Sequence, residues 1–445
     1  MNRTTRRPRT RVAGVLAATL AVSVLAVAPA SADEPTEVSG TLDDTTPYEF
    51  LVPPDWNGTV FVDLDFAGGT VTPTHRALLE DGAAYGGTSR AVTGWDISQA
   101  IDNQVEAVHR FAAEAGEPSR VIAMGASMGG FVAAGVAQEH PEEIDGAVAM
   151  CGGLSGAVAQ WNQKLDTVFV LSELTDPAGD LPVIDIPDRD AAIAAWQAHL
   201  ADAQQTPEGR ARIALAAAIG QLPAWSESAP RPDPRDTASY QAGWYGALSG
   251  DSLPYIGQAM SSRHTLTQVY GGNPSWNVGI DYAVQLERVS DEARAVVERL
   301  YGQAGLSLQE DLAALRDAPR ISADPDALTR FARLDVTGEL DVPVVTMNNI
   351  GDQISTVAQQ QEYQREVREA GNARLLRQTY VASPAHCGFS DAERLAAAHL
   401  LLDRLDRGRW TGGESSEEMN RTAESFGLGA ARFLTYQPDR FNRPY

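Results

Sequence analysis

The stretch RVIAMGASMGG, residues 120–130, decides how we interpret this chain. Its first half is a short apolar run typical of a buried strand, and residues 128–140 are typical of a helix. At the junction, Gly125, Ser127 and Gly129 form the pattern G-x-S-x-G, in which a sharp strand-to-helix turn exposes a serine as a nucleophile. A chain with 39 glycines also produces this pattern by chance. Whether Ser127 is a nucleophile therefore has to be judged from the neighbouring segments.

Predicted strands and helices alternate on both sides of this stretch. Apolar runs predict strands at residues 37–42, 48–53, 59–66, 83–89, 120–127, 144–153, 341–348 and 374–381. Apolar residues at helical spacing predict helices at residues 75–81, 96–115, 128–140, 357–370 and 390–405. Such alternation is typical of an α/β fold with a parallel sheet.

The alternation stops in the middle of the chain. Residues 154–335 hold helix-like segments separated by proline- and glycine-rich turns, with no convincing strand. We expect them to form a helical cap between the two parts of the α/β core, residues 33–153 and 336–410. Residues 411–445 are rich in aromatic side chains, so we expect a C-terminal extension that packs on the core.

The first 32 residues are typical of a secretory signal peptide. Five arginines precede an apolar run, which ends in Ala30-Ser31-Ala32. The run at residues 12–28 is shorter than the roughly 20 residues that a membrane anchor needs. We therefore expect cleavage after Ala32 and secretion from the cell rather than membrane anchoring. The pair Arg6-Arg7 leaves both the general and the twin-arginine export routes open.

Charge and composition argue against several classes of partner and cofactor. The formal net charge of −24 becomes −29 once the five arginines of the signal peptide are removed with no acidic residue. Such a surface repels nucleic acids and anionic membranes. The seven histidines and two cysteines show no metal-ligand spacing, so we expect neither a metal nor a cofactor.

The residues beyond two later strands complete a catalytic constellation with Ser127. A serine hydroxyl becomes a useful nucleophile when a histidine accepts its proton and an acid orients that histidine. Asp352 lies just beyond the predicted strand 341–348, and His386 lies just beyond the predicted strand 374–381. The other histidines lie on predicted helices or precede the acid. We therefore predict that Ser127, Asp352 and His386 form a catalytic triad.

The order serine, acid, histidine, each beyond its own strand, resembles the α/β-hydrolase superfamily. The resemblance covers most of the chain after the signal peptide. It implies a mixed, mostly parallel sheet of eight strands, with the large helical cap inserted after the sixth strand. It also implies that Ser127 is the nucleophile, Asp352 the acid and His386 the base.

The same resemblance implies an oxyanion hole made of two backbone N–H groups. The first would belong to Met128, directly after the nucleophile. The second normally comes from a His-Gly type loop, and this chain has LDFAGG, residues 64–69, at that place. The second donor would then be the N–H of Phe66 or of Ala67.

Two further patterns resemble secreted tannases and feruloyl esterases. They are P-x-W-N-G at residues 54–58 and the pair His386-Cys387. In those enzymes a cysteine directly precedes the nucleophile and is tied by a disulfide to the loop of the histidine, but here Ala126 stands in that place. The chain thus resembles a divergent secreted hydrolase of actinobacteria.

The only two cysteines, Cys151 and Cys387, are both expected at the carboxyl edge of the sheet. An oxidising compartment favours a disulfide between them. We predict this bond, with two buried free thiols as the alternative.

The leading functional hypothesis is a secreted serine esterase, which cleaves small-molecule or polymeric carboxylic esters through an acyl-enzyme on Ser127. A serine peptidase or amidase of exopeptidase type uses the same triad and stays open, as does a catalytically inactive binding protein. Aromatic residues of the cap either form its own core or line the substrate pocket. Outside the cap, we expect Trp95 to contact the substrate.

Overall fold

A nine-stranded sheet is the centre of the fold in the part of the chain that our computed structural model describes, residues 34–228 and 230–445. The predicted signal peptide lies outside the described residues. Pro35–Tyr445 form one unit. Its strands are β1 (Thr36–Thr41), β2 (Pro47–Val52), β3 (Thr59–Leu64), β4 (Ala84–Thr88), β5 (Arg120–Ala126), β6 (Gly146–Met150), β7 (Val344–Gly351), β8 (Leu376–Pro384) and β9 (Phe433–Leu434).

The strand order is β1-β2-β4-β3-β5-β6-β7-β8-β9, and the six strands from β4 to β8 in this order are parallel. The strands β1, β2 and β9 pair antiparallel with their neighbours. The sheet has one strand more than the eight expected, because the two residues of β9 pair with Tyr380 and Val381 of β8. All residues of β6 and β7 are buried, as expected for inner parallel strands covered on both faces.

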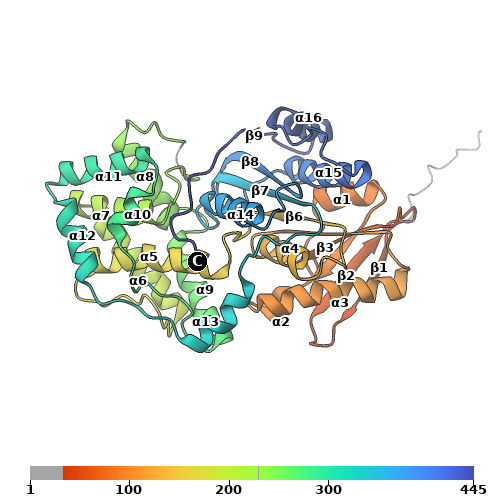
Figure 1. Cartoon of the computed structure of the whole chain (residues 1–445), viewed down its shortest axis with the longest axis horizontal. Helices are drawn as coiled ribbons and strands as arrows, with labels where there is room; N and C mark the ends of the chain where they lie inside the picture. Colours follow the sequence, from red (N-terminus) through yellow and green to blue (C-terminus); the bar gives the residue numbers. More distant parts are fainter. Residues whose placement is uncertain (1–33, 229) are drawn as a thin grey trace, which may run out of the picture. The chain divides into compact units, whose positions relative to one another are not determined.

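Helices cover both faces of this sheet (Figure 1). One apolar layer joins the sheet to α1 (Pro73–Glu80), α15 (Asp391–Arg407) and α16 (Ser416–Phe426). The other joins it to α3 (Ile97–Ala115), α4 (Met128–Glu139) and α14 (Ala358–Glu369), while α2 (Arg90–Thr93) follows β4. Among the described residues, no helix is long and apolar enough to cross a membrane.

The chain between β6 and β7 is helical. It contains α5 (Ala157–Thr175), α6 (Arg189–Ala203), α7 (Pro207–Ile219), α8 (Thr237–Tyr245), η1 (Gly246–Gly250), α9 (Tyr255–Tyr270), α10 (Tyr282–Glu287), α11 (Asp291–Ala304), α12 (Leu308–Asp317), α13 (Pro325–Phe331) and η2 (Ala332–Leu334). These helices have an apolar core of their own, in which Trp196 and Trp244 are 0% and 1% exposed. We refer to this region as the cap.

Helix α5 joins the cap to the sheet. Its first residues pack in the core of the sheet, around Trp161, and its second half packs in the core of the cap, around Phe169. Of its 19 residues, 17 are buried. The C-terminal segment reaches the same helix, because Arg443 forms a buried ion pair with Asp166 at 2.9 Å. The segment after β9 thus connects the edge of the sheet to the cap.

Candidate active site

Ser127 occupies the turn between β5 and α4. Its φ of 58° and ψ of −121° lie where non-glycine residues are uncommon, which is the strained geometry of a nucleophile elbow. A Cβ added to Gly125 would lie 2.5 Å from the carbonyl group of Gly129, and one added to Gly130 would collide with the carbonyl oxygen of Met150. Glycine is therefore required at residues 125 and 130. At Gly129, in contrast, an added Cβ would make only an ordinary contact.

The structure brings Ser127, His386 and Asp352 together. The Ser127 hydroxyl donates to His386 Nε2 at 2.7 Å. His386 Nδ1 donates to the two carboxylate oxygens of Asp352, at 3.0 Å and 2.9 Å. The side chains of His386 and Asp352 are 8% and 0% exposed, so little water competes for these hydrogen bonds.

The loop after β7 holds the Asp352 carboxylate by its own backbone. Oδ1 accepts hydrogen bonds from the backbone N–H of Ile354 at 2.8 Å and of Ser355 at 2.9 Å. Together with the His386 imidazole, these two N–H groups hold the Asp352 carboxylate in a single orientation. The position of the acid is thus fixed by residues next to it in the sequence.

A lysine from the cap touches the same loop. Lys164 of α5 is 1% exposed, and its Nζ donates to the carbonyl oxygen of Ile354 at 2.8 Å. Its ammonium lies 4.8 Å from the ring centroid of Tyr255 and 5.7 Å from that of Trp161. Burial lowers the pKa of Lys164 from its usual 10.5 to about 7, and the nearby Asp352 offsets only part of this shift.

The two expected segments of an oxyanion hole lie at the elbow. The N–H of Ala67 donates to the carbonyl oxygen of Thr88 at 3.1 Å, which excludes Ala67 as a free donor. Within residues 34–228 and 230–445, no hydrogen bond uses the N–H of Phe66 or of Met128. Asp65 has a φ of 78°, so the loop turns sharply just before Phe66. Phe66 and Met128 remain the donors that fit the expected site.

Cys151 and Cys387 form a disulfide, with Cα atoms 5.5 Å apart. Cys151 directly follows β6, and the N–H of Ser127 lies 3.3 Å from its sulfur while donating to the carbonyl oxygen of Met150. Cys387 is next to His386. The disulfide therefore joins the strand end beside the serine to the loop that carries the histidine.

Comparison with models of known protein families found no match. The o-phthalyl amidase of Xanthobacter agilis, however, is 32% identical to this chain over 445 aligned residues, which cover 92% of this chain and 97% of that protein. The chain belongs to the α/β-hydrolase superfamily, in the family of this amidase.

Solved structures of other α/β-hydrolases are similar at lower identity. Feruloyl esterase B from Aspergillus oryzae is 13% identical, with 84% of this chain and 80% of that chain covered and a TM-score of 0.39. Est1E from Butyrivibrio proteoclasticus is 10% identical, with 83% and 99% covered and a TM-score of 0.37.

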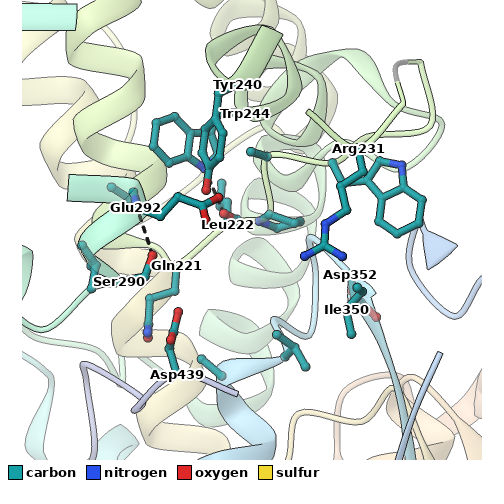
Figure 2. Close-up of a pocket in the computed structure, with 18 of the residues that line it drawn as sticks. Gln221, Leu222, Arg231, Tyr240, Trp244, Ser290, Glu292, Ile350, Asp352 and Asp439 are labelled. Carbon is teal, nitrogen blue, oxygen red and sulfur yellow. Dashed lines mark hydrogen bonds between the residues drawn. The ribbon is translucent and has the colours of Figure 1, made fainter. Parts of the chain in front are cut away.

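A cavity of about 380 Å³ adjoins the acid of this α/β-hydrolase (Figure 2). Ile350 and Asp352 line it from the sheet, while residues of α7, α8 and α11 and of the C-terminal segment line it from the cap. Figure 2 shows the guanidinium of Arg231 pointing toward Ile350 and Asp352. The lining also includes Trp225, so one of the cap tryptophans faces open space rather than the core of the cap.

Trp95 lies between α2 and α3, edge-on to Trp161 of α5 with ring centroids 6.0 Å apart. Its carbonyl oxygen accepts a hydrogen bond from the Tyr270 hydroxyl of α9 at 3.3 Å. Trp95 therefore contacts the cap from the sheet side. A contact with substrate stays a prediction.

Three charged residues near the triad were not anticipated from the sequence. Arg90 follows β4 at the carboxyl edge of the sheet, where side chains of parallel strands gather, and this position was a usable signal. Asp63 lies beneath the elbow, with Oδ1 3.0 Å from where a Cβ of Gly125 would be. Lys164 lies in a helix without amphipathic periodicity, so the sequence carried no comparable signal for it.

Proposed function

We propose that this protein is a serine hydrolase that cleaves carboxylic amides through an acyl-enzyme formed on Ser127. The proposal depends on one observation, the continuous hydrogen-bonded path from Ser127 Oγ through the His386 imidazole to Asp352. In such an arrangement the imidazole accepts the serine proton, and the carboxylate stabilises the imidazolium that forms.

In the proposed reaction, Ser127 Oγ forms a bond to the substrate carbonyl carbon while its proton moves to His386 Nε2. The oxyanion that develops accepts hydrogen bonds from the N–H groups of Met128 and Phe66. His386 then gives the proton to the leaving nitrogen, the C–N bond breaks, and the amine departs. Water attacks the acyl-enzyme with His386 as base, which releases the carboxylic acid and restores the serine.

The relative favours amides over the esters expected first, because it is an amidase that aligns with nearly the whole chain. Esters are the second candidate, since an alkoxide leaves more readily than an amine and the triad chemistry serves both. An amidase should therefore also cleave a matched ester, whereas an esterase need not cleave the amide.

The acyl group is the next element of the proposal. The relative is named for o-phthalyl substrates, and an o-phthalyl group is a benzoyl group with a carboxyl at the ortho position. We assign the recognition of such a carboxylate to Arg90, whose guanidinium lies against Met128 and Asp65, beside the two segments of the expected oxyanion hole. Asp65 occupies the Nε edge of this guanidinium, and the Nη1 edge can donate a charge-assisted hydrogen bond to a substrate carboxylate.

The disulfide supports a location outside the reducing cytosol, because such bonds persist in oxidising compartments. This agrees with the secretion expected from the N-terminal residues. The partner that we propose is a small-molecule substrate.

Benzanilide and phenyl benzoate, which share one acyl group, test the function. We expect turnover of both by the wild-type protein. Ser127→Ala should lower both rates by about 10⁴-fold or more. Turnover of the ester but not of the amide would show that the protein is an esterase rather than an amidase. No turnover of either compound or of the anilide of phthalic acid, or equal rates in Ser127→Ala, would contradict the proposal and favour a binding protein.

A further inference from the structure

Lys164 is the only lysine among the 445 residues, since the other 34 of the 35 basic residues are arginines. Lysine side chains are almost never fully buried unless they are paired with an acid. Lys164 is 1% exposed, yet it takes part in no ion pair with any described residue. A chain that otherwise uses arginine thus places its single lysine in a buried position without a counterion.

The contacts of Lys164 connect it to the triad through one residue, Ile354. The carbonyl oxygen of Ile354 accepts from Lys164 Nζ at 2.8 Å, and the N–H of Ile354 donates to Asp352 Oδ1 at 2.8 Å. The lysine and the acid therefore hold the same residue from its two ends. Because Lys164 belongs to α5, this connection also joins the cap to the triad.

Two charged groups face Lys164. One is Asp352 of the loop after β7, and the other is Arg263 of α9. Of the two acids on the helix of Lys164 itself, Asp166 is already paired with Arg443 at 2.9 Å, and Glu173 is exposed near the end of the helix. Tyr255, which packs against the ammonium, stays neutral because burial raises its pKa well above the usual value.

The choice of lysine over arginine has a chemical consequence. An arginine would stay charged at any pH that the protein meets, whereas a buried lysine can lose its proton. Burial brings the pKa of Lys164 to about 7 but that of Arg263 only to about 10. Of these two cations, Lys164 is thus the one whose charge changes near neutral pH.

We propose that Lys164 is a positioning residue of the triad, which holds the Asp352 loop to the cap and sets the net charge beside the carboxylate that orients His386. This inference rests on the proposed function, because it assigns Lys164 a part in the chemistry of that triad. An ammonium beside Asp352 offsets some of its negative charge and so makes the imidazolium of His386 less stable. The protonated lysine therefore keeps His386 available as a base at lower pH.

The substitution Lys164→Met removes the charge and keeps most of the length of the unbranched side chain. We expect the acid limb of its kcat/KM profile, measured with phenyl benzoate, to move about 0.5–1 pH unit higher, because the imidazolium is then more stable. We also expect kcat to fall, because the loop loses its hydrogen bond. The matched variant Lys164→Arg keeps the charge, so its acid limb should stay at the wild-type pH.

A purely structural lysine would give a different result. Both variants would then lose activity by a factor that does not change with pH, and the acid limb would stay where it is. That outcome, or an equal displacement of the acid limb in Lys164→Arg, would overturn the proposal. The proposed function itself is tested separately, by comparing the rates of Ser127→Ala and the wild-type protein.

A direct measurement needs no variant, because the chain has one lysine. Wild-type protein labelled with ¹⁵N-lysine should give a single side-chain signal whose titration midpoint lies near pH 7. A midpoint below about pH 5 would leave the amine neutral on the acid limb, and this would overturn the proposal even if both variants failed to fold.

Discussion

Arg90 Nη1 lies 3.5 Å from the sulfur of Met128, the residue that follows the proposed nucleophile. The opposite edge of the guanidinium is occupied, because Nε donates to the two oxygens of Asp65 at 2.7 Å and 2.9 Å and Nη2 also binds this carboxylate. A thioether is a weak acceptor, so the Nη1 edge has no oxygen partner among the described residues. With its side chain 38% exposed, Arg90 can present this edge to a ligand.

Arg90→Met should therefore weaken recognition of an acyl group with an ortho carboxylate. We expect kcat/KM for the anilide of phthalic acid to fall about 10- to 100-fold, and that for benzanilide to change less than about 3-fold. The ratio of the two substrates is the measurement, because it does not depend on how much of the variant folds.

The control for this ratio is Arg120→Met, which removes another arginine paired with an aspartate, at the amino end of β5. It should leave the ratio unchanged. Equal losses on both anilides in Arg90→Met would show that Arg90 only supports the oxyanion segments. If the wild-type protein has equal kcat/KM for the two anilides, Arg90 does not recognise a substrate carboxylate. That result would leave the amidase proposal intact.

The disulfide should stabilise the fold as well as the site. It closes a loop of 236 residues, for which the chain-entropy estimate is about 5 kcal/mol at most. We expect the double variant Cys151→Ala/Cys387→Ala to unfold at a lower urea concentration than the wild-type protein. We also expect dithiothreitol to lower the midpoint of the wild-type protein but not that of the double variant. An unchanged midpoint in both experiments would mean that the bond contributes nothing to stability.

The buried carboxyl beneath the elbow predicts a dependence of stability on pH. Asp63 accepts a hydrogen bond from the Tyr85 hydroxyl at 3.0 Å, and burial raises its pKa from 3.8 to about 7. Between these pH values the folded protein holds a proton that the unfolded chain releases. The free energy of unfolding therefore falls through this group as pH rises from about 4 to 7, and it stays lower above 7.

Asp63→Asn keeps an acceptor for Tyr85 but removes this titration. The variant should unfold at a higher temperature than the wild-type protein at pH 8, and the difference should shrink toward pH 4. Thermal unfolding followed by circular dichroism at both pH values measures it. A difference that is the same at pH 4 and pH 8 would contradict the raised pKa.

The sequence was sufficient for the sheet, because its strands carry strong local signals. Strands appear at all eight predicted places, and the order of Ser127, Asp352 and His386 follows from residues that end three of them. The short β9 was not predicted, because two residues give no periodicity and the pairing partner lies far away in the sequence. Helix α5 has no bounds that the sequence predicts, since a helix buried on nearly every side has no polar face to give it a helical period.

The chemistry around the triad was harder to predict than the triad. The sequence left Phe66 and Ala67 as equal candidates, and only a backbone hydrogen bond to Thr88 separates them. Lys164 is distant in sequence from Asp352, and the two meet only because α5 crosses the loop after β7. A sequence motif identifies functional residues that are close together in the chain. Lys164 and Asp352 are far apart in the chain and come together only through the packing of the cap.

The most direct test of the proposed mechanism is to find the acyl group on Ser127. Wild-type protein mixed with 4-nitrophenyl benzoate, quenched with acid and digested, should give a peptide containing Ser127 that is heavier by one benzoyl group, with the modification at the serine hydroxyl. Ser127→Ala should give no benzoylated peptide from this region. A benzoyl group on another residue, or turnover at the wild-type rate in Ser127→Ala, would contradict the account.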